Sequence, residues 1–387
     1  MNSSGVQPIQ ASQRLTIIDI LRGWALLGVV LMNYYDYYFS GKNSGELHPG
    51  TLTLVLEYIC AYVFSAKSWT LLSFLFGYGF AVLMDNLRAK GRHPVLFFIG
   101  RMWWLLVLAF VNSAFFAGDI LKDYALLGLV LLLFYRCSAR TTFLIGIALL
   151  AAEPVVSHFV QAMPEPHWDR QHRRLLYRSH NLIDVWKSNL IGTYYNEMIS
   201  PFYAINVHLV MLYCFLFGFS AQRVRFFSDL SRHKKTLWRV WWISLAFALV
   251  MIVPGYINHR LRWPFDNYYS MAFPVAIATM SFTLSSICLL YLGGRLQRLF
   301  RSLAAVGRMT LTNYMTQSVL ILLLFSGFGL GLAGKEPIYF YLGVAIVIYV
   351  LQIFFSRWWL SRYQYGPVEW VWRMLSYRKR LTLRREG

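Results

Sequence analysis

Long apolar runs separated by short polar segments dominate the hydrophobic pattern of the chain. A helix that crosses a bilayer needs about 20 mostly apolar residues, because the hydrocarbon core is about 30 Å thick. The pattern therefore predicts an all-α transmembrane bundle of about ten spans. These spans cover residues 16–39, 51–87, 95–116, 120–135, 141–162, 201–222, 237–257, 268–292, 309–332 and 337–359. The second run is interrupted by Ser65-Ala-Lys-Ser68, so we interpret it as one crossing plus a partial or interfacial helix.

The first apolar run carries four polar side chains in a single stripe. At about 100° per residue, Arg22 and Asn33 nearly eclipse, and Asp19 and Asp36 fall within about 60° of them. A charge that faces lipid costs several kcal/mol, so this stripe must face protein or a water-filled cavity. The first helix therefore predicts a bundle with a polar interior. Asp19 and Arg22 fit either a structural ion pair or part of a functional site.

The composition agrees with a polytopic membrane protein and helps to orient it. Of 387 residues, 57% are hydrophobic and only 14% are charged, yet the net charge is +20. Nucleic acid could explain such a charge, but Lys and Arg also gather in the cytoplasmic loops of membrane proteins. Most of the Lys and Arg residues here fall on one side of the predicted spans. We therefore expect no nucleic-acid partner and place both termini in the cytoplasm.

The predicted organisation is a single transmembrane domain over residues 1–380 with two appended features. Residues 163–200 form an extracytoplasmic loop that is too short to fold alone. Its arginines could attract an anionic acceptor or belong to ordinary solvated surface. Residues 360–387 mix Trp with Arg and predict an interfacial tail on the cytoplasmic surface.

Further polar groups fall near span ends and within spans. Arg101 and Asn112 are eleven residues apart on the third span and share a face, and Asp119 and Asp123 follow on the outer side. The ninth span begins with a polar face that includes Asn313 and Gln317. Such amides often only hydrogen-bond a neighbouring membrane helix, which is the alternative to a role in chemistry.

Histidine is the side chain best suited to exchange protons near neutral pH. His48, in the outer loop after the polar first helix, and His208, beside Asn206 and Tyr203, are the two candidates for a catalytic base. The other histidines fall in loops and are interpreted as surface residues. No metal-ligand spacing is present among the histidines and four cysteines, so no metal is expected.

Five sequence blocks resemble the YeiB-like family of bacterial inner-membrane proteins. They extend in order over nearly the whole chain, and the last two are the most specific. The blocks are Asp19-Ile-Leu-Arg-Gly-Trp-Ala-Leu-Leu-Gly28 with Asn33, Ser73-Phe-Leu-Phe-Gly-Tyr-Gly-Phe80, Gly118-Asp-Ile-Leu-Lys-Asp-Tyr-Ala125, Gly307-Arg-Met-Thr-Leu-Thr-Asn-Tyr-Met-Thr-Gln-Ser318 and Tyr365-Gly-Pro-Val-Glu-Trp-Val-Trp-Arg373.

The first block also resembles the start of heparan-alpha-glucosaminide N-acetyltransferase and, more loosely, membrane acyltransferases that modify envelope sugars. The resemblance implies a bacterial inner-membrane enzyme that passes an acyl group from cytoplasmic acyl-CoA to an acceptor across the membrane. In that superfamily a histidine after the first span is catalytic, and His48 is the nearest match, although its spacing from Asn33 differs. Family members also commonly carry a histidine where this chain has Asn112.

The expected function is therefore an acyltransferase, with acetyl-CoA or another acyl-CoA as co-substrate and a sugar or other envelope small molecule as acceptor. Basic groups at the cytoplasmic mouth would hold the CoA phosphates, and His48 or His208 would deprotonate the acceptor. Amides would stabilise the oxyanion, and aspartates would orient these groups or hold the acceptor. The predicted catalytic residues are His48, His208, Asp19, Asn33, Asp119 and Asp123. The predicted donor-binding residues are Arg22, Arg101, Arg308, Asn313 and Gln317.

The alternative is a transporter or flippase in which the same polar stripe lines a path for a polar or lipid-linked solute. No inverted repeat or matched pair of broken helices supports it. A histidine whose loss abolishes activity but not folding would separate the two hypotheses. The expected partners are membrane lipids and a small-molecule or lipid-linked acceptor. The sequence also allows a homodimer.

Overall fold

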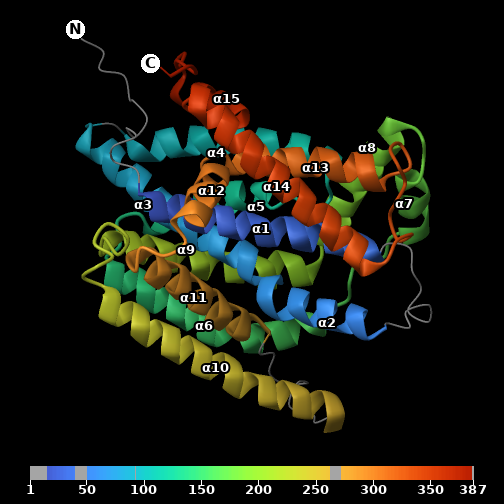
Figure 1. Cartoon of the computed structure of the whole chain (residues 1–387), viewed down its shortest axis with the longest axis horizontal. Coiled ribbons are helices and arrows are strands. Elements are labelled where there is room, and N and C mark those ends of the chain that lie inside the picture. Colours follow the sequence, from blue (N-terminus) through green and yellow to red (C-terminus); the bar gives the residue numbers. More distant parts are fainter. Residues whose placement is uncertain (1–14, 40–49, 92, 262–271, 386–387) are drawn as a thin grey trace.

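The computed structural model describes residues 15–39, 50–91, 93–261 and 272–385, and this part of the chain is helical (Figure 1). The α-helices are α1 (Thr16–Phe39), α2 (Thr51–Ile59), α3 (Lys67–Ala89), α4 (Pro94–Phe115), α5 (Leu121–Leu131), α6 (Ala139–Gln161), α7 (Arg170–Tyr177), α8 (Leu182–Thr193), α9 (His208–Arg223), α10 (Lys234–Leu261), α11 (Ala272–Leu292), α12 (Gln297–Arg308), α13 (Thr310–Phe325), α14 (Ile338–Arg362) and α15 (Pro367–Tyr377). Four shorter helical segments adjoin them: η3 (Cys60–Phe64), η4 (Leu132–Phe134), η5 (Tyr194–Met198) and η6 (Phe202–Val207).

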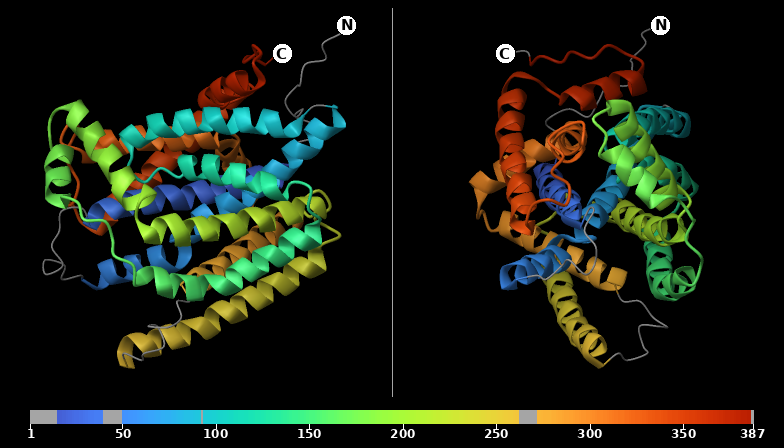
Figure 2. Two further views of the ribbon diagram at one scale, coloured as in Figure 1. Left: turned by 180° about the vertical axis from the view of Figure 1, so that it is seen from behind. Right: turned by 90° about the vertical axis from the view of Figure 1, so that its right-hand side faces the viewer.

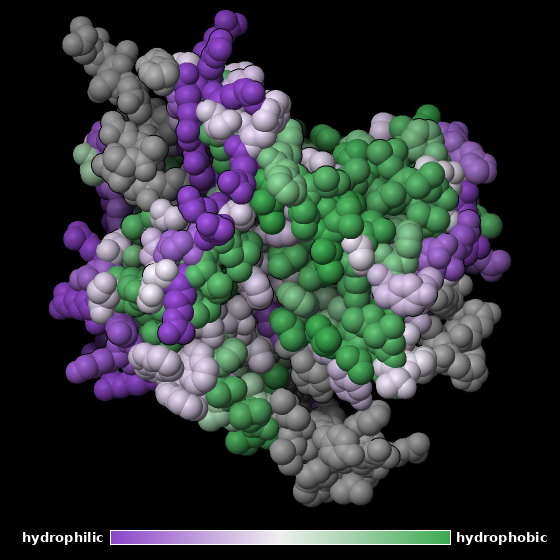
Figure 3. All heavy atoms as spheres, in the orientation of Figure 1, coloured by the Kyte–Doolittle hydropathy of each residue, from purple (hydrophilic) through white to green (hydrophobic). Residues whose placement is uncertain are grey.

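Seven helices among the described residues are long and apolar enough to cross a membrane, so the prediction of an all-α membrane bundle is confirmed. They are α1, α3, α4, α6, η6 with α9, α11 and α14. α13 is apolar but has only 16 residues, and α5 has 11, so both are shorter than a full crossing usually requires. Apolar side chains gather over the middle of the surface and hydrophilic ones at its two ends (Figure 3). Ten crossings and cytoplasmic termini stay predictions.

Helix α1 lies in the middle of the bundle, as its polar stripe predicts (Figures 1 and 2). Two glycines let it pack directly against α12. A Cβ atom at Gly23 would overlap the carbonyl oxygen of Leu303, and one at Gly307 would overlap that of Asp19. The Tyr349 hydroxyl on α14 donates to the Gly23 carbonyl at 2.7 Å. Small residues permit such backbone contact between membrane helices, and here they fix the helix that carries Asp19 and Arg22.

The predicted interruption of the second apolar run is confirmed. α2 and η3 end at Phe64, and α3 begins at Lys67 after Ala66, whose φ of 60° is left-handed. In α3, Gly77 lies against the backbone of Phe215, while Gly218 on α9 lies against Phe74. These contacts join α3 closely to α9, the helix that begins at His208.

The segment 163–200 contains α7, α8 and η5, so it is more helical than a loop. Two side chains attach it to the last turn of α4 and to the segment that follows it. Asn189 donates to the Ala114 carbonyl at 2.8 Å, and the Thr193 hydroxyl donates to the Ala117 carbonyl at 3.1 Å. This attachment places Glu197 of η5 beside the turn that joins α4 to α5.

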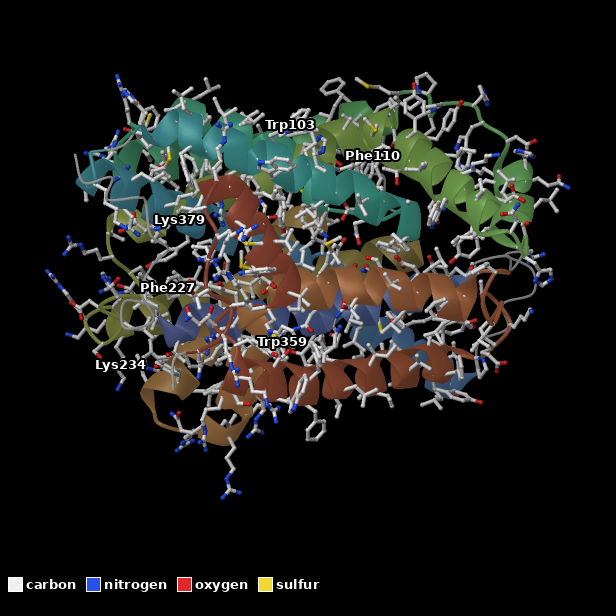
Figure 4. The ribbon with its side chains drawn as sticks, turned by 90° about the horizontal axis from the view of Figure 1, so that it is seen from above. Trp103, Phe110, Phe227, Lys234, Trp359 and Lys379 are labelled. Atoms are coloured by element: carbon white, nitrogen blue, oxygen red, sulfur yellow. The ribbon has the colours of Figure 1, made fainter. Side chains whose placement is uncertain are left out.

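The C-terminal tail packs on the bundle through α15. Glu369 accepts hydrogen bonds from the Leu311 and Thr312 amides at 2.7 and 3.1 Å and from the Thr312 hydroxyl at 2.5 Å. A carboxylate at the first turn of a helix satisfies free N–H groups and complements the helix dipole. Seen from above, α15 lies between α4, where Trp103 and Phe110 are labelled, and α14, which carries Trp359 (Figure 4). The tail therefore caps α13 and contacts α4.

Candidate functional site

The main polar cluster lies where α4, α5, η5, η6, α9 and α13 meet. Asp123 is its centre, with 2% of its side chain exposed. Its Oδ1 lies 3.0 Å from Nε2 of His208, and its Oδ2 accepts hydrogen bonds from the Tyr203 hydroxyl at 2.8 Å and from Lys122 Nζ at 3.1 Å. The fold therefore brings together two predicted site residues that are 85 positions apart in sequence.

His208 is the most accessible member of this pair, with 23% of its side chain exposed. Its Nδ1 lies 3.0 Å from the backbone oxygen of Ala204, one turn earlier. Both ring nitrogens thus face oxygen atoms. A carbonyl oxygen or an ionised carboxylate oxygen can only accept a hydrogen bond. A proton on Nε2 lets the ring donate to Asp123, and in that form Nδ1 is left to accept a proton once it is turned away from the Ala204 carbonyl. Asp123 therefore orients the ring and would stabilise a positive charge that forms on it.

Lys122 neutralises several oxygens around the same point. Besides Asp123, its ammonium group forms an ion pair with Glu197 and donates to the Asp119 carbonyl at 2.8 Å. It also lies 5.1 Å from the centre of the Tyr203 ring. Buried carboxylates need such a partner, because an isolated charge in a low-dielectric interior is very costly.

Two carboxyl groups of the cluster lie in connecting segments and have altered acidity. Burial raises the pKa of Glu197 to about 8, against the opposing attraction of Lys122. Burial also raises the pKa of Asp119 to about 6, although Asn112 donates to its Oδ1 at 2.9 Å. Carboxyl groups that titrate this close to neutral pH are typical of functional sites.

The Gly118-Asp-Ile-Leu block forms the turn that positions these groups. Asp119 lies in the turn before α5, and Asp123 lies in the first turn of that helix. Tyr314 of α13 holds the turn, since its hydroxyl accepts from the Ile120 amide at 3.2 Å and donates to the Gly118 carbonyl at 3.4 Å. This contact joins the third of the family-like blocks to the fourth.

A second polar cluster lies at the other end of α4. Arg22 and Asp19 are 3.5 Å apart, with 30% and 4% of their side chains exposed. Arg101 lies over the ring of Trp372 at 3.8 Å and is within electrostatic reach of Arg22 and Arg373. The guanidinium groups therefore come from three separate elements, α1, α4 and α15. Since Arg101 and Asn112 are eleven residues apart, about 16 Å of helix separates the two clusters.

The remaining predicted residues lie elsewhere. The Asn313 amide donates to Ser356 at 3.0 Å, and the Gln317 amide donates to Gln352 at 2.8 Å, so both bind α14. Asn33 is half-buried on α1, and Arg308 is half-buried at the end of α12. His48 lies outside the described residues. In the described part of the chain, no group of three His, Cys, Asp or Glu side chains is placed to hold a metal ion.

The sequence did not single out Lys122, Glu197, Tyr203 or Tyr314 as site residues. Lys122 stands next to Asp123 inside the Gly-Asp-Ile-Leu block, which was a usable signal. The sequence shows Tyr203 only as a near neighbour of His208. Glu197 gave no signal, because its contact with Lys122 joins positions that are far apart in sequence.

Comparison with known proteins assigns the class first. Residues 14–177, which include α1, Asp119 and Asp123, match the family described as heparan-alpha-glucosaminide N-acetyltransferase, catalytic. Residues 221–379 match the family described as protein of unknown function (DUF418). With seven long apolar helices among its described residues, the chain is a multi-pass membrane protein that is similar to membrane acyltransferases.

Whole-length relatives then assign the family. The chain is 30% identical to the uncharacterized protein YxaH of Bacillus subtilis over 97% of each chain. It is 25% identical to the uncharacterized protein YeiB of Escherichia coli, over 95% of this chain and 97% of that protein. The chain therefore belongs to the YeiB-like family that includes YxaH. No solved structure matches it.

Proposed function

We propose that this protein is an acyltransferase that moves an acyl group from cytoplasmic acyl-CoA to a hydroxyl or amine on an envelope sugar or lipid-linked small molecule. Its proposed location is the bacterial inner membrane, with both termini in the cytoplasm. The match of residues 14–177 to an acetyltransferase catalytic domain supports this class of reaction. The single observation that carries the proposal is the Asp123–His208 pair, in which the carboxylate is buried and 23% of the histidine side chain is exposed.

The histidine contacts suggest which nitrogen reacts. Asp123 holds the Nε2 side of the ring, whereas Nδ1 meets only the backbone carbonyl of Ala204. An acceptor hydroxyl that displaces this carbonyl would meet Nδ1 in its deprotonated form. The hydroxyl proton would then move to Nδ1 as the oxygen attacks the thioester carbonyl. The new C–O bond forms, the C–S bond breaks, and the proton passes from Nδ1 to the leaving thiolate.

The donor phosphates are assigned to the other cluster. Arg22 and Arg373 both lie within electrostatic reach of Arg101, and guanidinium groups bind phosphate oxygens in a bidentate manner. The acyl end of the donor would extend from there along α4 toward His208. Arg308 at the end of α12 is a further candidate for this role.

Stabilisation of the oxyanion is assigned to Asn33 rather than to the two amides of α13. The side-chain N–H groups of Asn313 and Gln317 already donate to α14, so both are better explained as helix-packing residues. His48 stays an alternative base, and Asp119 an alternative acceptor-binding group.

The first test of the proposal is acyl transfer by the purified protein. Radiolabelled acetyl-CoA is supplied with a panel of sugars and lipid-linked sugars, and acetylated product and free thiol are measured. His208→Gln is expected to lower kcat by about 100-fold or more, within the usual contribution of a general base. His180→Gln, on the exposed surface, is the matched control and is expected to keep full activity. Full activity of His208→Gln would exclude this residue as the base.

The second test is donor binding without any acceptor. Acetyl-CoA should raise the thermal stability of the detergent-purified protein by mass action, and Arg22→Ala should reduce that stabilisation. Arg232→Ala removes an exposed cation from a different loop and should bind the donor normally. Failure of acetyl-CoA and longer acyl-CoAs to stabilise the protein at millimolar concentration would favour the transporter hypothesis instead.

A further inference from the structure

A hollow of about 400 Å³ between α12 and α14 is lined mainly by cations. Arg298, Leu299, Arg301 and Ser302 come from α12, and Arg357 comes from α14. All three arginines are exposed. Among the described residues, no carboxylate forms a salt bridge with any of them. Three like charges around one hollow repel each other, and a bound anion would relieve that repulsion.

An apolar stripe on α14 extends from this hollow toward the middle of the helix. Val347, Leu351, Phe354 and Trp358 are spaced by four, three and four residues, which places them on one face of a helix. All four are at least half exposed, between 50% and 64%. α14 is also the most apolar of the seven candidate spans, so this stripe faces lipid chains.

The stripe ends at Trp358, the residue next to Arg357 of the hollow. Trp358 stands next to Arg357, and Arg362 lies over its ring at 4.9 Å. Tryptophan and arginine side by side near the end of a membrane helix are typical of the interface between hydrocarbon and water. A ligand in the hollow would therefore have its polar part at the arginines and its apolar part along α14.

We propose that this hollow binds the phosphate of an anionic glycerophospholipid, with one acyl chain lying along the α14 stripe. Arginine suits a phosphate diester because its planar donors match phosphate oxygens. Basic pockets between helices at the cytoplasmic membrane surface bind anionic headgroups in this manner. A soluble phosphate compound would use the arginines but not the stripe, so the two features together favour a lipid.

The proposed lipid would also connect the membrane to the donor cluster. The other face of α12 carries Phe300, Leu303 and Val306, which are buried in the core. Gly307 of the same helix touches the Asp19 backbone. A lipid that holds α12 against α14 would therefore stabilise the position of the first turns of α1. None of the three arginines belongs to the proposed donor-binding set, so this site can exist even without acyl transfer.

The test is lipid binding by the full-length protein in detergent, measured by native mass spectrometry and thermal shift. Phosphatidylglycerol is compared with phosphatidylcholine, inorganic phosphate and acetyl-CoA. We expect saturable binding of phosphatidylglycerol that neither phosphate nor acetyl-CoA displaces. The combined change Arg298→Gln, Arg301→Gln and Arg357→Gln should weaken it by at least about tenfold, because all three cations that line the hollow are lost.

The matched control removes three exposed cations from the turn before α10 and from the start of that helix by Arg232→Gln, Lys234→Gln and Lys235→Gln. This control should bind phosphatidylglycerol normally. Phe354→Ser keeps the arginines but interrupts the stripe, and it should weaken lipid binding without changing the monodispersity of the protein. The proposal would be overturned if phosphatidylcholine bound as well as phosphatidylglycerol, or if phosphate or acetyl-CoA displaced the lipid. It would also be overturned if the triple variant and its control lost lipid binding to the same extent.

Discussion

Replacing Asp123 by asparagine tests the organisation of the main polar cluster without any knowledge of the substrate. The amide keeps the shape of the carboxylate but removes its charge. Asp123 meets an imidazole, a phenol and an ammonium group, and only 2% of its side chain is exposed. In Asp123→Asn, Lys122 keeps Glu197 as its partner, but the charge beside His208 is lost.

The expected cost follows from burial. Removing one partner of a buried ion pair typically destabilises a protein by about 3–5 kcal/mol, because the other charge stays buried. Asp85 and Arg223 supply the control, since their 2.6 Å pair has 37% and 21% of its side chains exposed. Asp85→Asn should cost about 1 kcal/mol or less, as is usual for exposed pairs. The free energy of unfolding is measured by SDS titration in mixed micelles, with tryptophan fluorescence as the signal.

A double-mutant cycle separates the Lys122–Asp123 pair from general disruption of the site. Lys122→Met and Asp123→Asn are measured singly and together, and the combined cost should differ from the sum by about 0.5–3 kcal/mol. If Asp123→Asn costs no more than Asp85→Asn, or if the two changes add without coupling, the cluster is not organised as the contacts indicate.

Three further predictions concern the tail, the outer segment and the α1–α12 contact. Glu369→Gln should destabilise the protein by about 1.5–3 kcal/mol, because a charged acceptor of three hydrogen bonds is lost, and amide exchange should rise around Thr312. The folded-state pKa of Glu197, near 8, exceeds its ordinary value of 4.5, so the folded state binds more protons between these values. The free energy of unfolding should therefore fall as pH rises through that window, and Glu197→Gln should flatten this dependence. Gly307→Ala should strongly lower folded yield in size-exclusion chromatography because its Cβ would overlap the Asp19 carbonyl, whereas Gly343→Ala enters open space and should not.

Much of the architecture could be predicted from hydrophobic periodicity. The apolar runs predicted the long helices, the polar stripe predicted the central position of α1, and Ser65-Ala-Lys-Ser68 predicted the break before α3. These features are local, because they depend on spacing within one helix. Helices α7 and α8 could not be recognised in the same way, since they are short and α7 is polar. Such short helices are stabilised mainly by contacts with other elements, such as the hydrogen bond of Asn189 to Ala114.

The candidate site was predictable as a set of residue types but not as a set of contacts. The side-chain chemistry of Asp123 and His208 makes both of them candidates, yet nothing in their spacing indicates that they meet. The amides of Asn313 and Gln317 looked equally suited to a site, and the fold places them against α14 instead. Long-range packing decides such cases, and a single sequence carries little direct information about it.

The protonation pattern around His208 bears on both the enzyme and the transporter hypotheses. Lys122 and the imidazolium form of His208 contribute two positive charges, whereas Asp123, Asp119 and Glu197 contribute up to three negative ones. Two of these carboxyl groups have pKa values of about 6 and about 8, so the net charge of the cluster changes by up to two units near neutral pH. A cluster of this kind can take and return a proton at little cost. Proton exchange alone would suit a transporter as well as an enzyme, so thioester cleavage that depends on His208 is the observation that separates them.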